Sequence, residues 1–138
     1  MEDGASFAEI DFTGAEQFQA MRRQLGVTSF GMNVISLRTG QRLRIHRHAQ
    51  QEEVYVVLVG VLTLSIETED HRLERGATAR VAPAVRRQLT NRDPGLLLVL
   101  ALGGVGHHEG RDGEAFTSWD ETSGRPPQEV PFPPDLDL

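Results

Sequence analysis

The chain has 138 residues, a formal net charge of −6 and no cysteine, which predicts one acidic domain without disulfides or Cys-ligated zinc. The acidic balance argues against a nucleic-acid partner, because such a partner favours a basic surface. The N-terminus lacks the pattern of a signal peptide and no apolar run is long enough to span a membrane, so we expect a cytoplasmic protein with no membrane contact.

A short helix is predicted at residues 14–25, after an irregular N-terminal arm. Thr13 begins a capping-box pattern, with a glutamate three residues later, and Gly26 follows as the stop. Between them, apolar residues recur at helical spacing: Ala15, Phe18, Met21 and Leu25. We interpret this stripe as a packing surface and expect Arg22 and Arg23 to face solvent.

From Val27 the apolar pattern changes from helical spacing to alternation, which indicates β-strands. Glycine and proline separate the alternating stretches and mark turns. The predicted strands are residues 27–37, 43–48, 52–59, 61–67, 71–74, 77–82, 87–91 and 96–102. Many short strands at near-regular spacing predict an all-β protein, an antiparallel β-barrel or double-stranded jelly roll, with a short N-terminal helix and an irregular C-terminal tail.

Two histidines and a glutamate form the first candidate site. His46 and His48 are two residues apart in a predicted strand, so both imidazoles point to the same face. Glu53 begins the next strand, and its carboxylate can reach the same point if the two strands pack together. Imidazole and carboxylate are common ligands of Zn, Fe, Mn, Ni and Cu. The pattern therefore predicts a divalent metal site formed by these three side chains.

The residues around this pair resemble the first motif of the cupin superfamily. Five positions match at the spacing of that motif: Gly40, His46, His48, Glu53 and Gly60. A His-x-His pair alone is more often incidental, whereas five residues at fixed spacing are a fairly specific match. The resemblance covers about residues 30–102 and implies a small β-barrel that binds a small molecule.

The second cupin motif is present only in part. Gly76 and Asn91 match it, whereas Pro83 is one place late and Ala84 replaces the usual glycine. The chemically important departure is Arg87, which stands where the family has its third metal-binding histidine. A guanidinium stays protonated and has no lone pair to donate, so Arg87 cannot be a metal ligand.

Two interpretations of the pocket follow, and the sequence leaves both open. In the first, Arg87 swings outward, and His46, His48 and Glu53 hold Fe, Mn, Ni or Zn with open coordination positions. The resemblance to cupins then implies small-molecule chemistry such as dioxygenation, isomerisation or decarboxylation. Arg87 has to move because a divalent metal about 4 Å from it would be repelled by about 8 kcal/mol at an effective dielectric near 20.

In the second interpretation, Arg87 turns inward and pairs with Glu53 in place of the metal. The barrel is then a metal-free pocket for an anionic ligand, a small carboxylate or phosphate, and the protein is a sensor or binding module. A barrel that kept the fold and lost its activity is the third possibility. Tyr55 and Arg44 lie on the pocket face, although Tyr55 could be core and Arg44 could reach solvent.

Both faces of the predicted strand at 52–59 are apolar, so its outer face must be covered. The N-terminal helix, the tail or a second subunit could cover it, and we hypothesise a homodimer. The chain is divided into three parts: an arm and helix at 1–26, the β-barrel at 27–106 and a proline-rich tail at 107–138. In the tail, Phe116, Trp119, Val130 and Phe132 are expected to dock on the barrel, and His107 and His108 to be solvated.

Overall fold

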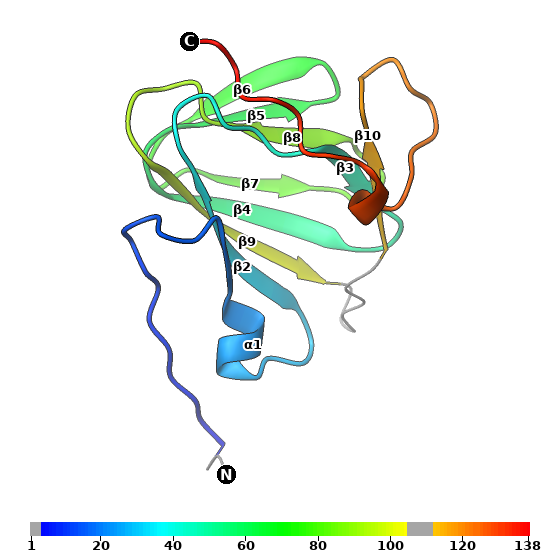
Figure 1. The fold of residues 1–138 in the computed structure, drawn as a ribbon. Helices are drawn as coiled ribbons and strands as arrows, with labels where there is room; N and C mark the ends of the chain where they lie inside the picture. The colour runs from blue at the N-terminus through cyan, green and yellow to red at the C-terminus, as the bar shows by residue number, and fades with distance from the viewer. Residues whose placement is uncertain (1–3, 105–111) are drawn as a thin grey trace.

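Two antiparallel sheets pack face to face in the computed structural model, which describes residues 4–104 and 112–138 (Figure 1). Sheet A has the order β1 (Phe18–Ala20), β2 (Gly31–Leu37), β9 (Leu97–Gly104), β4 (Glu52–Val59) and β7 (Thr78–Val81). Sheet B has the order β10 (Gly113–Phe116), β3 (Ile45–His48), β8 (Arg87–Thr90), β5 (Leu62–Ile66) and β6 (Glu69–Leu73). The prediction of an all-β antiparallel jelly roll is confirmed.

The N-terminal segment differs from the prediction. The helix α1 spans only Met21–Leu25, and the preceding residues form β1, in which Phe18 pairs with Ile35 of β2. The predicted helix at 14–25 is therefore wrong before residue 21, because pairing with a distant strand outweighs the local helical pattern. Gly26 adopts a left-handed conformation and ends the helix as predicted.

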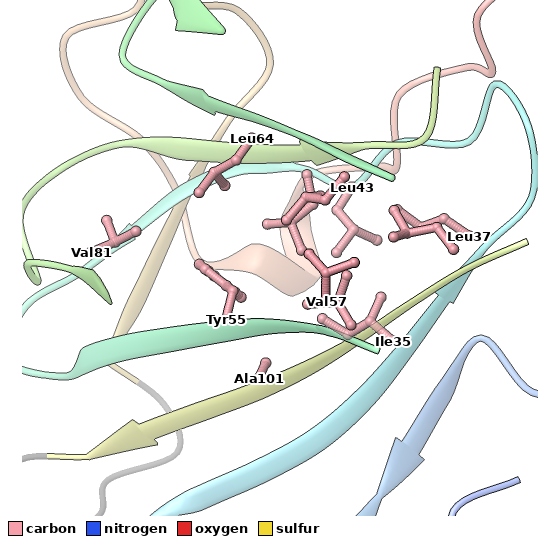
Figure 2. Close-up of a cluster of buried hydrophobic side chains, with 12 residues drawn as sticks. Ile35, Leu37, Leu43, Tyr55, Val57, Leu64, Val81 and Ala101 are labelled. Atoms are coloured by element: carbon pink, nitrogen blue, oxygen red, sulfur yellow. The ribbon is translucent and has the colours of Figure 1, made fainter. Parts of the chain in front are cut away.

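The space between the two sheets is filled by aliphatic side chains and one tyrosine (Figure 2). The members from sheet A are Ile35, Leu37, Tyr55, Val57, Val81, Leu97, Val99 and Ala101, and those from the rest of the chain are Leu43, Leu62, Leu64 and Leu89. In β2 the side chains alternate as the sequence indicates, since Ile35 and Leu37 face this interior while Val34 faces the other side of the sheet. The packing between the sheets therefore determines which side chains of each strand point into the interior.

The outer face of sheet A carries a second apolar cluster. Met21 of α1 packs there with Val34 and Leu98, and Ile10 of the N-terminal arm adds to the cover. Leu58 of β4 joins this cluster, so the arm and the helix cover part of the apolar outer face of that strand. No helix in the described part of the chain is long and apolar enough to cross a membrane.

The C-terminal tail is more ordered than the sequence suggests. Its first described residues form β10, which pairs with β3 through Ala115 and His46 among others, a strand that was not predicted. Phe116 and Val130 are buried, as expected for docking on the sandwich, and Trp119 is partly buried, whereas Phe132 is 43% exposed. His107 and His108 lie outside the described residues.

A glycine at the end of β4 is required by a close backbone approach. Gly60 has a φ of +82°, and a β-carbon there would lie 2.4 Å from the carbonyl oxygen of Leu96. No other residue type fits this position without displacing the neighbouring strand. The match of Gly60 to the first motif therefore has a physical cause.

We predict that Asn91→Ala lowers the free energy of unfolding by about 3 kcal/mol, because its amide satisfies several backbone groups in the interior. Asn91 is 1% exposed, and its Nδ2 donates to the carbonyls of Leu37 and Gly95 at 2.9 Å. Its Oδ1 accepts from the backbone amide of Asp93 at 3.0 Å. Urea unfolding measures the change, and the exposed neighbour gives the control Arg92→Ala, for which we expect less than about 0.5 kcal/mol. Equal losses in the two variants would contradict this role.

Candidate functional site

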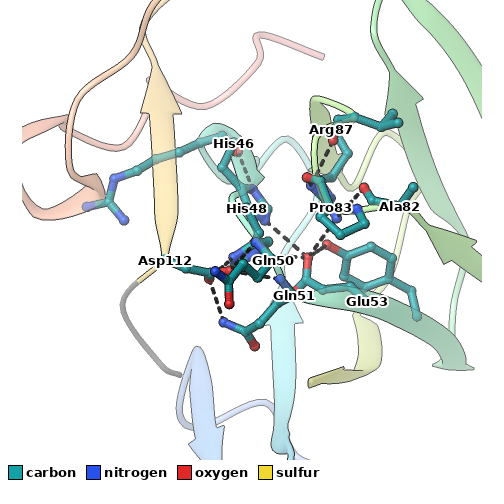
Figure 3. Close-up of polar contacts among 12 residues, drawn as sticks. His46, His48, Gln50, Gln51, Glu53, Ala82, Pro83, Arg87 and Asp112 are labelled. Atoms are coloured by element: carbon teal, nitrogen blue, oxygen red, sulfur yellow. Dashed lines mark hydrogen bonds and ion pairs between the residues drawn. The ribbon is translucent and has the colours of Figure 1, made fainter. Parts of the chain in front are cut away.

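Two strands from different sheets bring the predicted metal ligands together. His46 and His48 alternate along β3 of sheet B, and Glu53 stands near the start of β4 in sheet A. One ligand atom from each residue lies within 4.8 Å of the others. Figure 3 shows the side chains of His46, His48 and Glu53 gathered in one place. Their convergence follows from the two-residue period of β3 and from the short β3–β4 connection, which leads directly into Glu53.

One oxygen of Glu53 is the meeting point of the site. Its Oε1 lies 3.4 Å from Nε2 of His46 and 3.3 Å from Nε2 of His48. The hydroxyl of Tyr55 donates a hydrogen bond to the same oxygen at 2.5 Å. Tyr55 is 1% exposed and belongs to the interior cluster, so it is both a core residue and a contact of Glu53.

Arg87 is turned inward and fully buried. Its Cα pairs with that of His46 between β8 and β3, and its Nη2 lies 3.4 Å from Oε1 of Glu53. The hydrogen bonds of the guanidinium go to backbone carbonyls instead: Nη1 donates to Val85 at 2.7 Å and to Pro83 at 3.2 Å. The contact with Glu53 is therefore an ion pair held in place by a cradle of carbonyl oxygens.

His48 is oriented by a carboxylate that the sequence did not reveal. Its Nδ1 lies 2.7 Å from Oδ1 of Asp112, whose other oxygen accepts from the backbone amides of Gln50 and Gln51 at 2.9 and 2.8 Å. Nε2 of His48 is buried and has no hydrogen-bond partner within residues 4–104 and 112–138. A metal-bound histidine has this arrangement, with one nitrogen held by a carboxylate and the other free for the ion.

The electrostatics of the site favour an ionised Glu53. Burial raises the pKa of Glu53, but contacts with His46 and His48 lower it more, and the net pKa lies well below its usual value. Burial lowers the pKa of His48, but the carboxylates of Glu53 and Asp112 raise it above its usual value. Hydrogen bonds from Gln50, Gln51 and His48 outweigh burial and lower the pKa of Asp112 to about 2. Both carboxylates are therefore anions at neutral pH.

The side chain of Arg44 contacts the tail. Its Nε donates to the carbonyl of Val130 at 2.5 Å, and its guanidinium stacks 3.8 Å from the centre of the Phe132 ring. Arg44 was predicted as a pocket residue, and its contact with the site is through the backbone, since its carbonyl oxygen lies 3.3 Å from Nδ1 of His46. The sequence pattern gave its strand face but could not show that the tail returns to that strand.

A pocket of about 270 Å³ opens beside the site. His48 and Glu53 line it together with side chains from β2, β9 and α1. Arg22 and Arg23 of α1 are among these lining residues, although the sequence placed both in solvent. That expectation holds for Arg23, which is exposed, and is wrong for Arg22, which is partly buried.

The residues present fit a divalent metal ion with three protein ligands. His46 and His48 offer nitrogen and Glu53 offers an ionised oxygen, a donor set suited to Zn, Fe, Mn or Ni. Nε2 of His48 is buried and forms no hydrogen bond in the described residues, and its 3.3 Å contact with Oε1 of Glu53 places two potential ligand atoms side by side. Arg87 occupies the fourth side of the group and supplies no ligand.

The cupin domain family matches residues 33–103, which is more than half of the chain. The chain is a cupin. The matched region contains both sequence motifs and every strand from β3 to β8. No curated protein sequence is significantly similar to this cupin.

Solved structures share its fold. A cupin protein from Bacteroides fragilis superposes with a TM-score of 0.66 at 21% identity, covering 90% of this chain and 100% of that one. A sugar phosphate isomerase of the cupin superfamily from Silicibacter pomeroyi gives 0.64 at 21% identity, with 76% and 69% covered. A protein from Acidithiobacillus ferrooxidans gives 0.61 at 22% identity, with 69% of this chain and 60% of that one covered. These likenesses establish the fold of this cupin.

We predict that Arg87→Met lowers the free energy of unfolding by about 3 kcal/mol, because it leaves the buried Glu53 carboxylate without its cationic partner. Urea unfolding measures the change. Arg80→Met is the matched control, since Arg80 forms an exposed ion pair with Glu52 and its loss should cost less than about 1 kcal/mol. Similar small losses in the two variants would show that the buried pair does not stabilise the fold.

Proposed function

We propose that this cupin binds a divalent metal ion through His46, His48 and Glu53 and holds a small molecule in the pocket beside it. The observation that carries the proposal is the orientation of His48, whose Nδ1 is held by Asp112 while its buried Nε2 points to Oε1 of Glu53 at 3.3 Å, beside the second predicted ligand. A carboxylate that orients a ligating histidine in this way is a regular feature of metal sites.

A metal held by three protein ligands keeps open positions for a ligand. When bound, the ion would act as a Lewis acid that polarises an oxygen atom of that ligand. The chain itself supplies the rest of the environment: Tyr55 holds Oε1 of Glu53 by a hydrogen bond, and Arg87 keeps positive charge behind the carboxylate. Arg87 opposes the ion, and the negative charge of Glu53, which touches Arg87, offsets part of that repulsion.

The second candidate is a metal-free pocket for an anionic small molecule. The observation that favours it is the inward, fully buried Arg87, whose Nη2 lies 3.4 Å from Oε1 of Glu53. In this case the guanidinium supplies the positive charge that a metal would otherwise provide. The protein is then a binding or sensing module, with no reaction at this site.

The ligand in either case is a small, oxygen-rich molecule. The sugar phosphate isomerase from Silicibacter pomeroyi makes phosphorylated sugars reasonable compounds to include in a ligand screen. The pocket volume of about 270 Å³ lies below the roughly 300–1,000 Å³ typical of pockets for drug-sized ligands, which favours compounds of few carbons.

We predict that the purified, tag-free protein loaded with Fe, Mn, Ni or Zn retains about one metal ion per chain, and that His46→Ala and His48→Ala lose it. Asp112→Asn should weaken metal affinity by roughly 10- to 100-fold, because His48 loses the carboxylate that orients it. Plasma mass spectrometry after dialysis measures the metal content, and competition with a chromophoric chelator measures the affinity.

Glu114→Gln is the matched control for Asp112→Asn. Glu114 is a nearby carboxylate that pairs with Arg47 and accepts from the amide of Gly124, with no contact to His46 or His48. The metal affinity of the Glu114→Gln variant should equal that of the unaltered chain. Retention of no metal by the unaltered protein would exclude the first candidate and leave the metal-free pocket, whose ligands are then detected by shifts in the melting temperature.

We also predict that the protein is a homodimer that uses the outer face of sheet A. Val54 and Leu102 line a shallow apolar depression there beside Phe30, which is 40% exposed. Leu102→Glu should weaken self-association by placing a charge in the contact. Light scattering at micromolar concentration measures the mass, and a monodisperse monomer of the unaltered chain would contradict the prediction.

A further inference from the structure

Two arginines of the short helix face the same pocket as the candidate metal ligands. The chain leaves β1 at Ala20 and turns into α1, and this turn places Arg22 and Arg23 next to each other in the lining of the pocket. His48 and Glu53 line the same space. The helix therefore supplies cationic groups to a pocket that two of the three candidate metal ligands also line.

The side chains that line the pocket include two arginines and one glutamate, so positive charge exceeds negative charge there. Glu53 is the single acidic residue among the lining residues in the described part of the chain. Its Oε1 contacts Tyr55 and Arg87, and Glu53 forms no ion pair with Arg22 or Arg23 in the described part of the chain. Nε of Arg22 is buried and has no hydrogen-bond partner within the described ranges, so this guanidinium has an unsatisfied donor.

The shape of the pocket limits the size of such a ligand. Gly103 forms part of the lining, and a β-carbon there would lie 3.0 Å from Oε1 of Gln51. The backbone of β9 thus opens space that a side chain would close. A volume of about 270 Å³ accommodates a short organic acid or a phosphorylated compound of few carbons.

We propose that Arg22 and Arg23 form an anion subsite that binds the carboxylate or phosphate group of a small ligand, with the rest of the ligand directed toward His48 and Glu53. The proposal rests on the function proposed above, in which this pocket is the ligand-binding site. Guanidinium groups bind both kinds of anion through paired N–H donors, so carboxylate and phosphate share one recognition chemistry here. Arg22 supplies the partly buried contact and Arg23 the solvent-exposed one.

The test is calorimetric titration of the full chain with inorganic phosphate and, separately, with malonate, each before and after loading with Mn²⁺. We expect saturable binding of at least one of the two anions. Arg22→Gln and Arg23→Gln should each weaken it by roughly 10- to 100-fold, as expected for loss of a hydrogen bond to a charged group. Comparing the two anions identifies which group the subsite prefers.

Arg75→Gln is the matched control, because Arg75 is exposed in the turn between β6 and β7 and does not line the pocket. It removes the same charge and should leave anion affinity unchanged. Arg23→Gln alters an exposed side chain, so it remains informative if Arg22→Gln reduces the folded fraction in thermal unfolding.

The outcomes separate this proposal from that of the metal site, because metal content is measured on the same samples. Anion binding that depends on Arg22 and Arg23 supports the subsite, whether or not Mn²⁺ is retained. Absence of anion binding, or equal binding by the two variants and the control, overturns the subsite even when Mn²⁺ is retained. Loss of both readouts in the unaltered chain overturns both proposals.

Discussion

A single carboxylate oxygen connects the two sheets at the open end of the sandwich. Oε1 of Glu53, carried by sheet A, is contacted by His46, His48 and Arg87 from sheet B and by the hydroxyl of Tyr55. Burial makes this charge unfavourable unless donors surround it, and the surrounding side chains meet that requirement. The relative position of the sheets and the chemistry of the pocket are therefore set by the same contact.

The buried arginine follows from the same constraint. A guanidinium in the interior needs both a counter-charge and acceptors for its hydrogen bonds. Glu53 supplies the charge, and the carbonyls of Ala82, Pro83 and Val85, in the turn before β8, supply the acceptors. Arg87 is thus held by a counter-charge and by carbonyl acceptors, with only its buried Nε lacking a hydrogen bond in the described residues, although it brings positive charge to a site that a cation would share.

Much of the fold could be predicted because its strands and turns follow from local patterns of apolar, polar and turn-forming residues in the sequence. Local patterns predicted the strands β2 to β9, alternation gave the facing sides of β2, β3 and β4, and the spacing of His46, His48 and Glu53 predicted that these side chains converge. The missing parts depend on contacts between distant segments: β1 pairs with β2, β10 pairs with β3, and Asp112 reaches His48 across 64 positions. No short-range pattern marks such partners, so neither the carboxylate behind His48 nor Arg22 at the pocket could be recognised from the sequence.

The carbonyl cradle of Arg87 also has a consequence for any exchange at this position. A shorter imidazole at position 87 would leave the carbonyls of Pro83 and Val85 without their donor. Introducing a third histidine would therefore disturb the turn before β8, so a complete three-histidine site would require changes in that turn as well as at position 87.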